Sequence, residues 1–223
     1  MGTDFWPLRR LRLTADTLEL RLPNESEVDE LARLASTESY NPSVPFLAGI
    51  DDTPVERGRR TLQTLWKDQA AWAPDRWVLY LVALDDGEPA GVANIRANDF
   101  AAVREVETGS WLHTGRRGTG LGTRLRVAAL TLAFDGLGAE YAASSASIAN
   151  NASLGVSAKL GYHPDGIDHR ASNGEVLTIQ RLRLAAADWA ERKADWGAVT
   201  VTGLAECRAM FGLDTAGTDI AAH

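Results

Sequence analysis

Apolar and polar side chains follow one another along this chain in short, well-separated blocks. Residues 18–23 (LELRLP) alternate between the two kinds, as a half-buried strand does, and Pro23 ends the block. From Asn24 or Ser26 the apolar residues recur at helical spacing as far as residue 36, and a second helical block covers residues 55–71. Residues 41–54, rich in proline, glycine and aspartate, predict a loop between the two helices.

The middle of the chain predicts neighbouring strands followed by a helix. Residues 77–84 (WVLYLVAL) are continuously apolar, which favours a strand buried on both faces. A turn at 85–89 joins this run to a partner strand at 90–97, and residues 104–112 predict a third strand. A glycine-rich stretch then leads into a helix that glycines 136 and 138 stop. Its apolar face consists of Leu121, Leu125, Ala128 and Leu132.

The last third of the chain predicts a strand at 139–147, a short helix from Asn150 to Gly161 and a final strand at 174–184. Residues 185–213 predict a helix, a short strand and another helix, an extension packed on the same domain. Residues 214–223 predict a disordered tail. The order of elements favours one domain over residues 1–184, of mixed α/β or α+β class.

Composition restricts the classes of function. The 223 residues carry a net charge of −7, which disfavours nucleic acid and anionic membranes as partners. Cys207 is the only cysteine, and the four histidines lack metal-ligand spacing. The start of the chain lacks the apolar segment of a signal peptide, and no apolar run is long enough for a bilayer. We expect a cytoplasmic protein without metal, nucleic-acid or membrane partner. The sequence does not decide whether the chain forms a homo-oligomer.

The stretch RRGTGLGTRLR, residues 116–126, places three glycines among four arginines and suggests an anion-binding loop. The ATP-binding loop needs a lysine after its glycines, which this stretch lacks. The dinucleotide pattern needs its third glycine one residue after Gly122, and the acid that follows, Glu140, begins the next strand instead of ending it. The pattern [QR]-x-x-G-x-[GA] is met from Arg117 to Gly122. Between a strand and a helix it favours pyrophosphate, because free N–H groups and the positive helix end meet there.

Three stretches resemble the RimJ/RimL-like branch of the Gcn5-related N-acetyltransferase (GNAT) superfamily, in the family's order. ETGSWLHTGRRGTGLGTRL at 107–125 resembles its E-x-G-x-W-L-x-x-x-x-R-G-x-G-x-[GA] segment. NNASLGVSAKLGY at 150–162 resembles its N-x-x-S-x-x-V-x-x-K-L-G-[FY] segment, and LTADTLELRLP at 13–23 resembles its opening, with Thr17 in place of the usual arginine. The two ends resemble actinobacterial-type members, one of which is similar to a succinyl-transferring enzyme. The resemblance implies the GNAT fold, a mixed, mostly antiparallel central sheet flanked by helices.

The resemblance also implies a site for acetyl-CoA or another acyl-CoA. The pyrophosphate would be held, mostly by backbone N–H groups, by Arg117, Gly118, Thr119, Gly120, Leu121, Gly122 and Thr123. Arg116 or Arg124 would pair with the 3′-phosphate. The pantetheine would lie between two splayed strands, with backbone groups from Ser110, Trp111 and Leu112 and with Asn150 beside it. The alternatives are solvated surface charges for the arginines, core packing for Trp111 and a plain helix cap for Asn150.

Transfer of an acyl group from a thioester to an amine needs a base for the ammonium and an acid for the thiolate. The resemblance gives Ser153 as the acid, and the alternative is a hydroxyl that satisfies the first helical turn. Glu107 is the preferred base. Glu105 lies on the same strand face, where close approach would raise one pKa, and the alternative leaves both carboxylates in solvent. The back-up candidates for the base are His163, His169 and Glu175.

The predicted function is an N-acyltransferase that moves an acyl group from acyl-CoA to a primary amine of a small molecule or protein, in a ternary complex. The same fold with succinyl-CoA or an aminoacyl-tRNA as donor is an alternative, although the acidic pI disfavours tRNA. A non-catalytic CoA sensor is another. A succinyl group needs a basic partner, for which Arg96, Arg104 and His169 are candidates. The loop at 41–54 predicts a wall of the acceptor site, with Tyr40 and Phe46 as apolar contacts.

Overall fold

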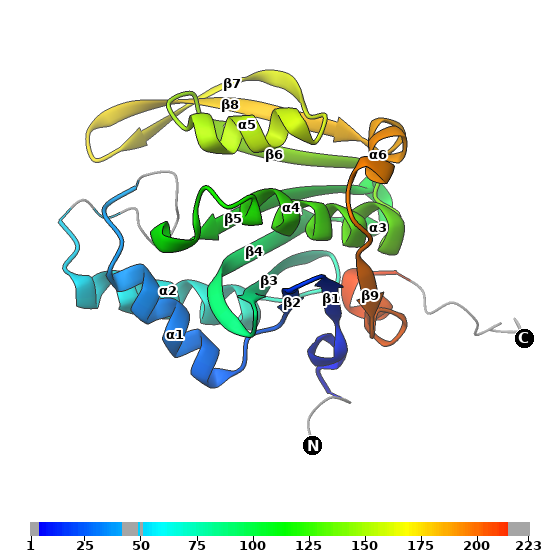
Figure 1. Cartoon of the computed structure of the whole chain (residues 1–223), viewed down its shortest axis with the longest axis horizontal. Helices are drawn as coiled ribbons and strands as arrows, with labels where there is room; N and C mark the ends of the chain where they lie inside the picture. Colours follow the sequence, from blue (N-terminus) through cyan, green and yellow to red (C-terminus); the bar gives the residue numbers. More distant parts are fainter. Residues whose placement is uncertain (1–4, 42–48, 50, 214–223) are drawn as a thin grey trace, which may run out of the picture.

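The structure is a computed structural model that describes residues 5–41, 49 and 51–213, and these residues form one nine-stranded sheet with helices on both faces (Figure 1). The strand order is β7-β8-β6-β5-β4-β3-β2-β1-β9. The strands are β1 (Arg12–Ala15), β2 (Leu18–Arg21), β3 (Arg76–Asp85), β4 (Glu88–Asn98), β5 (Glu105–Leu112), β6 (Tyr141–Ser147), β7 (His163–Ser172), β8 (Glu175–Ala185) and β9 (Thr200–Thr202). The α-helices are α1 (Glu25–Ser36), α2 (Pro54–Ala70), α3 (Phe100–Val103), α4 (Leu121–Thr131), α5 (Asn151–Lys159) and α6 (Ala186–Arg192). Shorter turns are η1 (Pro7–Arg10), η3 (Thr114–Arg116), the π-helical η4 (Leu132–Gly136), η5 (Lys193–Asp195) and η6 (Ala205–Phe211).

Neighbouring strands in the described sheet are antiparallel except for β5 and β6, which run parallel. This confirms the expected mixed, mostly antiparallel sheet flanked by helices. Parallel neighbours need a crossover, and α4 supplies it between β5 and β6. The one parallel pair therefore marks the place where the glycine-rich stretch joins a strand to a helix.

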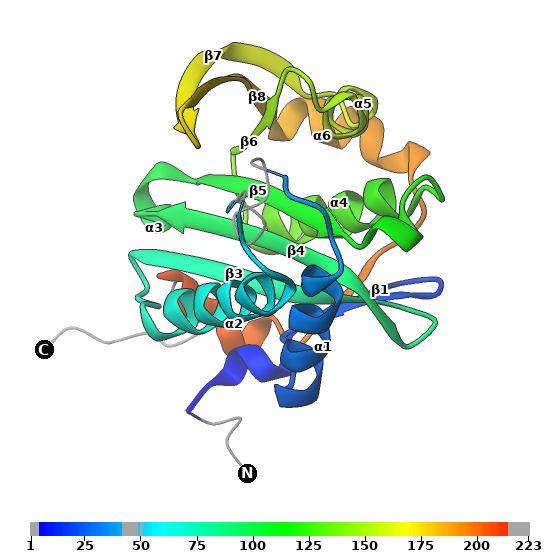
Figure 2. The same ribbon diagram turned by 90° about the vertical axis from the view of Figure 1, so that its left-hand side faces the viewer.

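Two apolar cores lie on the two faces of the sheet. Figure 2 shows α1 and α2 on one face of β3 and β4, with α4 on the other. The alternate residues of β3 divide between the cores: Trp77 and Leu79 pack on the α4 side, and Val82 packs with Leu31 of α1 and Leu65 of α2. The apolar run in β3 is therefore buried on both faces, as its sequence predicted.

The first two helices begin at capping boxes. The Asn24 side chain accepts a bond from the Glu27 N–H while the Glu27 carboxylate accepts one from the Asn24 N–H. Thr53 and Glu56 repeat this arrangement at the start of α2. Each box satisfies donors that have no partner within the helix. Of the two starts expected for α1, Asn24 and Ser26, the structure has Asn24.

The apolar pattern of the sequence did not predict two of the strands, β1 and β7. In β1 only Leu13 is buried, and β7 has no fully buried residue along its ten positions. Hydrogen bonds to β2 and β8 form these strands, so no alternation of apolar residues marks them. The predicted tail at 214–223 and the acceptor-wall residue Phe46 lie outside the described residues.

The C-terminal segment returns to the beginning of the chain. β9 pairs with β1, and Phe211 of η6 packs edge-on against Trp77, with ring centroids 4.9 Å apart. The Cys207 thiol lies 3.1 Å from the carbonyl of Pro7, and burial raises the pKa of Cys207 to about 11. A thiol with so high a pKa is a packing group instead of a nucleophile.

The helices in residues 5–41 and 51–213 are all too short or too polar to cross a bilayer. The same ranges contain no group of three metal-ligating side chains.

Candidate functional site

A fork in the sheet is the main feature of the site. β5 and β6 pair only through Glu105–Glu107 and Tyr141–Ala143. Beyond these residues the two strands separate, β5 staying with β4 and β6 staying with β8 (Figure 1). A cleft of about 490 Å³ opens along the unpaired part of β5. It runs from the fork to the glycine-rich loop, because Thr108, Leu112 and Gly120 all line it.

Alternate residues of β5 turn their backbone groups into this cleft. The N–H of His113 donates to Ala90 of β4, which places the odd-numbered residues toward β4. The carbonyl of Thr108 accepts a bond from Ser144 Oγ of β6 at 3.2 Å. The backbone of Ser110 and the N–H of Leu112 therefore face the fork, whereas the carbonyl of Leu112 accepts a bond from Arg117 Nε. Their contact with pantetheine remains a prediction. Trp111 differs from the expectation: its backbone faces β4, and its buried ring forms a wall of the cleft and part of the core.

The glycine-rich loop has the conformation of an anion cradle. Gly118 and Gly120 adopt positive φ angles of 79° and 85°, which side chains with a Cβ disfavour. Gly120 is the N-cap of α4, so the next two N–H groups have no acceptor within the helix. Within the described ranges, the N–H groups of residues 118–122 donate to no protein atom. Thr123 was expected to join them, but its N–H is bonded to the carbonyl of Gly120 at 3.0 Å.

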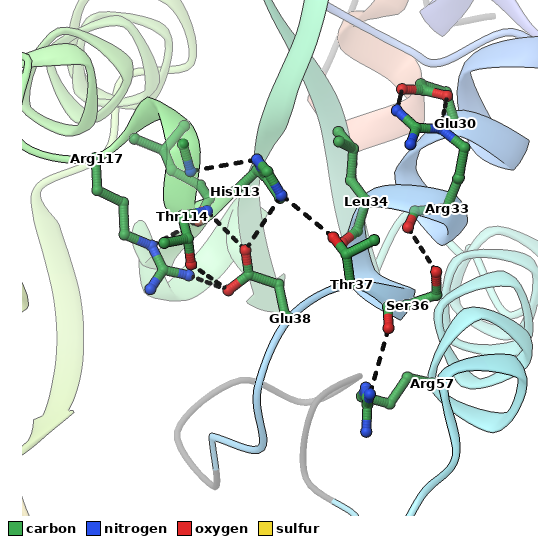
Figure 3. A network of polar contacts seen from close by, with 12 residues as sticks. Glu30, Arg33, Leu34, Ser36, Thr37, Glu38, Arg57, His113, Thr114 and Arg117 are labelled. Carbon is green, nitrogen blue, oxygen red and sulfur yellow. Dashed lines mark hydrogen bonds and ion pairs between the residues drawn. The ribbon is translucent and has the colours of Figure 1, made fainter.

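A buried glutamate outside the predicted motifs holds the loop in place (Figure 3). The side chain of Glu38, just beyond α1, is 3% exposed. One of its oxygens accepts from the N–H of Thr114 at 2.6 Å, and the other accepts from Thr114 Oγ1 at 2.8 Å and from Arg117 Nη2 at 2.6 Å. Arg117 Nε also donates to the carbonyl of Leu112 at 2.8 Å. The side chain of Arg117 thus fixes the loop through Glu38 and Leu112, and the backbone N–H groups are left to bind the anion.

His113 closes the same network. Its Nδ1 accepts from the N–H of Gly115 at 3.3 Å, which assigns the ring proton to Nε2. Nε2 lies 3.3 Å from Thr37 Oγ1 and 3.7 Å from Glu38 Oε1. An acidic residue just past a helix C-terminus opposes the helix dipole. That local conflict at Glu38 is the one signal in the sequence that points to a distant cationic partner.

The two arginines expected at the 3′-phosphate are held by Asp85. Arg116 Nη1 lies 3.6 Å and Arg124 Nη1 lies 3.8 Å from its carboxylate. Arg124 also donates to the carbonyl of Ala15 at 2.9 Å, so it is anchored to the turn between β1 and β2. The side chain of Arg116 is slightly more exposed than that of Arg124, at 41% against 36%.

The two glutamates of β5 are each paired with an arginine instead of with each other. Arg96 of β4 binds Glu107 through both guanidinium ends, with Nε 3.0 Å from Oε2. Arg183 of β8 donates to Glu105 at 2.6 Å. An arginine therefore stands beside each carboxylate, and the role of either one as the base remains a prediction. Glu107 lines the cleft, whereas Glu105 lies outside the residues that form its wall.

Asn150 and Ser153 meet at the start of α5. The side chain of Asn150 accepts from the Ser153 N–H at 3.1 Å, which makes Asn150 the helix cap. Both residues line the cleft, across the fork from β5. Asn150 is thus both the cap of α5 and a residue of the cleft wall, so the plain-cap alternative does not exclude a role in the cleft. The expected roles as pantetheine contact and acid remain proposals.

The cleft is basic although the whole chain is acidic. Its described lining contains one acidic side chain, Glu107, and five basic ones, Arg96, Arg117, Arg126, Lys159 and Arg170. Tyr80 of β3 also lines it and donates to Asp68 at 3.1 Å. Burial, together with the Asp68 carboxylate, raises the pKa of Tyr80, so this phenol stays protonated. The local field therefore favours a polyanionic ligand.

The comparison with known families identifies the domain. The profile described as the acetyltransferase (GNAT) domain matches residues 17–163, which is more than half of the chain. The chain belongs to the GNAT acetyltransferase family. The resemblance carried by the loop and by the 150–162 stretch is thereby confirmed, and the parallel, splayed β5–β6 pair is the GNAT feature that opens the cleft.

Solved GNAT structures share the fold. RimJ of Mycobacterium smegmatis, in complex with CoA-disulfide, is 18% identical with a TM-score of 0.67, over 92% of this chain and 95% of that one. RimL, described as a ribosomal L7/L12 alpha-N-protein acetyltransferase in complex with coenzyme A, is 19% identical with a TM-score of 0.59, over 77% and 95%. A chimera of the spermidine N-acetyltransferase SpeG from Vibrio cholerae and hSSAT is 17% identical with a TM-score of 0.62, over 79% and 99%.

Proposed function

We propose that this GNAT protein transfers an acyl group from acyl-CoA to a primary amine. The observation that carries the proposal is the fork between β5 and β6 with a cradle of free N–H groups at its mouth. The open edge of β5 gives room for an extended pantetheine arm: from Leu112 to Thr108 the strand rises about 13 Å at the usual 3.3 Å per residue. An extended pantetheine arm along this edge would bond to the backbone of Ser110, with the pyrophosphate on residues 118–122.

The remaining groups of the cleft suit the other parts of the donor. A second hollow, of about 330 Å³, shares Gly120, Thr123 and Lys159 with the cleft and extends to Trp196. It offers space for the adenosine end, with Lys159 near its phosphate. SpeG and RimL are described as acting on spermidine and on a protein α-amine, which supports an amine as acceptor.

The proposed reaction is direct attack in a ternary complex. The amine nitrogen bonds to the thioester carbonyl carbon, the carbon–sulfur bond breaks, and an amide and free CoA result. Glu107, directly or through a water, takes the proton that the attacking nitrogen loses, and Arg96 holds its carboxylate in the cleft. Ser153 gives a proton to the departing sulfur and regains it from solvent.

The ligand class is tested by thermal shift with CoA, acetyl-CoA, NAD and ATP. A ligand at 100 times its Kd stabilises the folded state by about 2.7 kcal/mol. That corresponds to a rise in Tm of roughly 5–10 °C for a chain of this size. We expect this rise with CoA and acetyl-CoA and less than about 2 °C with NAD and ATP. A clear response to NAD without one to CoA would reject the proposal.

The substitution Ser153→Ala is expected to lower kcat about 100-fold, with the Kd for CoA unchanged within about 2-fold, because the acid acts only in the transition state. Thiol release with spermidine, lysine and peptide N-termini as acceptors measures the rate. Ser145→Ala, which removes another hydroxyl from the cleft lining, is the matched control and should keep the wild-type rate. Equal rates for Ser153→Ala and wild type would remove Ser153 from this role.

A further inference from the structure

Arg126 lies at the closed end of the fork. It projects from α4, and its Nη1 donates to Ser144 Oγ at 3.1 Å and to Thr108 Oγ1 at 3.3 Å. Thr108 and Ser144 are the first residues beyond the last paired residues of β5 and β6. The guanidinium therefore sits where the two strands part, and it lines the cleft at the end opposite the loop.

This arginine is buried without a carboxylate. Arg126 is 3% exposed, and no acidic oxygen of the described residues lies within 4.0 Å of it. Its other neighbour is the ring of Tyr162, 5.9 Å from the guanidinium carbon, and its Nε is buried with no acceptor. The other cleft-lining arginines differ: Glu107 binds Arg96, Glu38 binds Arg117, and Arg170 is exposed, so water solvates its charge.

A buried cation is unfavourable unless an anion compensates it. Two neutral hydroxyls and one aromatic ring supply only part of that compensation. The guanidinium lies beside Thr108, whereas the proposed phosphate site lies beyond Leu112, four residues further along β5. The phosphates of the donor therefore do not reach Arg126. What reaches the fork is the acyl group, at the end of the pantetheine arm.

We propose that Arg126 determines the acyl group by binding a terminal carboxylate, so that the preferred donor is the CoA thioester of a short dicarboxylic acid such as succinate. This inference rests on the proposed function of the cleft. A neutral acyl group leaves the guanidinium uncompensated, whereas a carboxylate forms a charge-assisted bond with it. Arg104 and His169, two candidates from the sequence, do not line the cleft, and Arg96 is already paired with Glu107.

The test compares CoA, butyryl-CoA and succinyl-CoA by calorimetry on the wild-type protein and on Arg126→Met. Butyryl-CoA has the same number of acyl carbons as succinyl-CoA but no carboxylate. We expect the wild type to bind succinyl-CoA about 20-fold more tightly than butyryl-CoA, the scale of one hydrogen bond to a charged group. In Arg126→Met the ratio should fall to about 1, with the Kd for free CoA unchanged within about 2-fold.

Equal affinities for the two thioesters in the wild type would overturn this inference and leave the proposed function intact. Failure to bind CoA at all would reject the proposed function instead. The Tm without ligand separates a structural role: replacing a buried, uncompensated cation by an apolar side chain of similar length is often neutral or stabilising. A fall in Tm together with an unchanged preference for succinyl-CoA would make Arg126 a structural residue and overturn the proposal.

Discussion

Arg117→Glu is expected to raise the Kd for CoA by at least about 100-fold. The substitution places a second carboxylate beside Glu38, which is buried and already accepts two bonds from Thr114. Breaking a buried ion pair costs about 3–5 kcal/mol. Because Arg117 itself is 45% exposed, we expect a cost somewhat below that range, and this cost enters the Kd because the variant must restore the loop conformation in order to bind CoA. A cost of about 2.7 kcal/mol corresponds to 100-fold in Kd. Calorimetric titration of CoA measures the effect, with circular dichroism to show that the variant is folded.

Arg116→Glu is the matched control. It makes the same change in net charge one residue away, but the one carboxylate beside the Arg116 side chain in the described part of the chain is that of Asp85, at 3.6 Å. Its Kd for CoA should rise less than about 10-fold. Similar losses in the two variants would mean that the charge of the loop matters instead of the contact with Glu38, and full affinity in Arg117→Glu would reject the assignment of the loop.

Glu107→Gln is expected to lower kcat by about 100- to 1,000-fold at pH 7, within the usual contribution of a general base. The amide keeps the shape and the hydrogen bond to Arg96 but cannot take a proton from the attacking nitrogen. The loss should shrink as pH rises toward about 10, since a lysine-type amine with a pKa of about 10.4 then loses its own proton. A pH profile of thiol release from pH 6 to 10 measures both effects.

Glu105→Gln is the control for this second prediction. It makes the same chemical change on the same strand, at a residue paired with Arg183 and absent from the cleft lining. Its kcat should stay within about 3-fold of wild type. A loss in Glu107→Gln that is independent of pH would indicate that the residue positions Arg96 and is not the base.

Local patterns predicted most of the fold, because burial leaves a period in the sequence. The run at 77–84 and the capping residue Asn24 each mark their element through contacts only a few residues apart. β7 is largely exposed and, among the described strands, pairs only with β8, so its sequence carries no apolar period. The glycine pattern likewise located the loop, since Gly118 and Gly120 need backbone angles that few other residues accept.

The parts of the site that escaped prediction depend on contacts between distant residues. Glu38 and Arg117 are 79 positions apart, and only the folded chain brings α1 to the loop. Arg126 stands inside a helix whose other buried residues are apolar, where a sequence reader assigns a solvated charge. The arginine partners of Glu105 and Glu107 escaped prediction for the same reason, because they come from β8 and β4.

The short β9 has a consequence for aggregation. A sheet that ended at β1 would offer a row of unpaired N–H and C=O groups, which other chains can use as a template. Three residues of β9 cover β1, and Gly203 then turns the chain away: a Cβ there would lie 2.1 Å from the carbonyl oxygen of Arg10. So short an edge strand has few unpaired backbone groups with which a strand of another chain could form hydrogen bonds. A chain cut after β8 would therefore leave the hydrogen-bonding groups on the outer edge of β1 open to other chains.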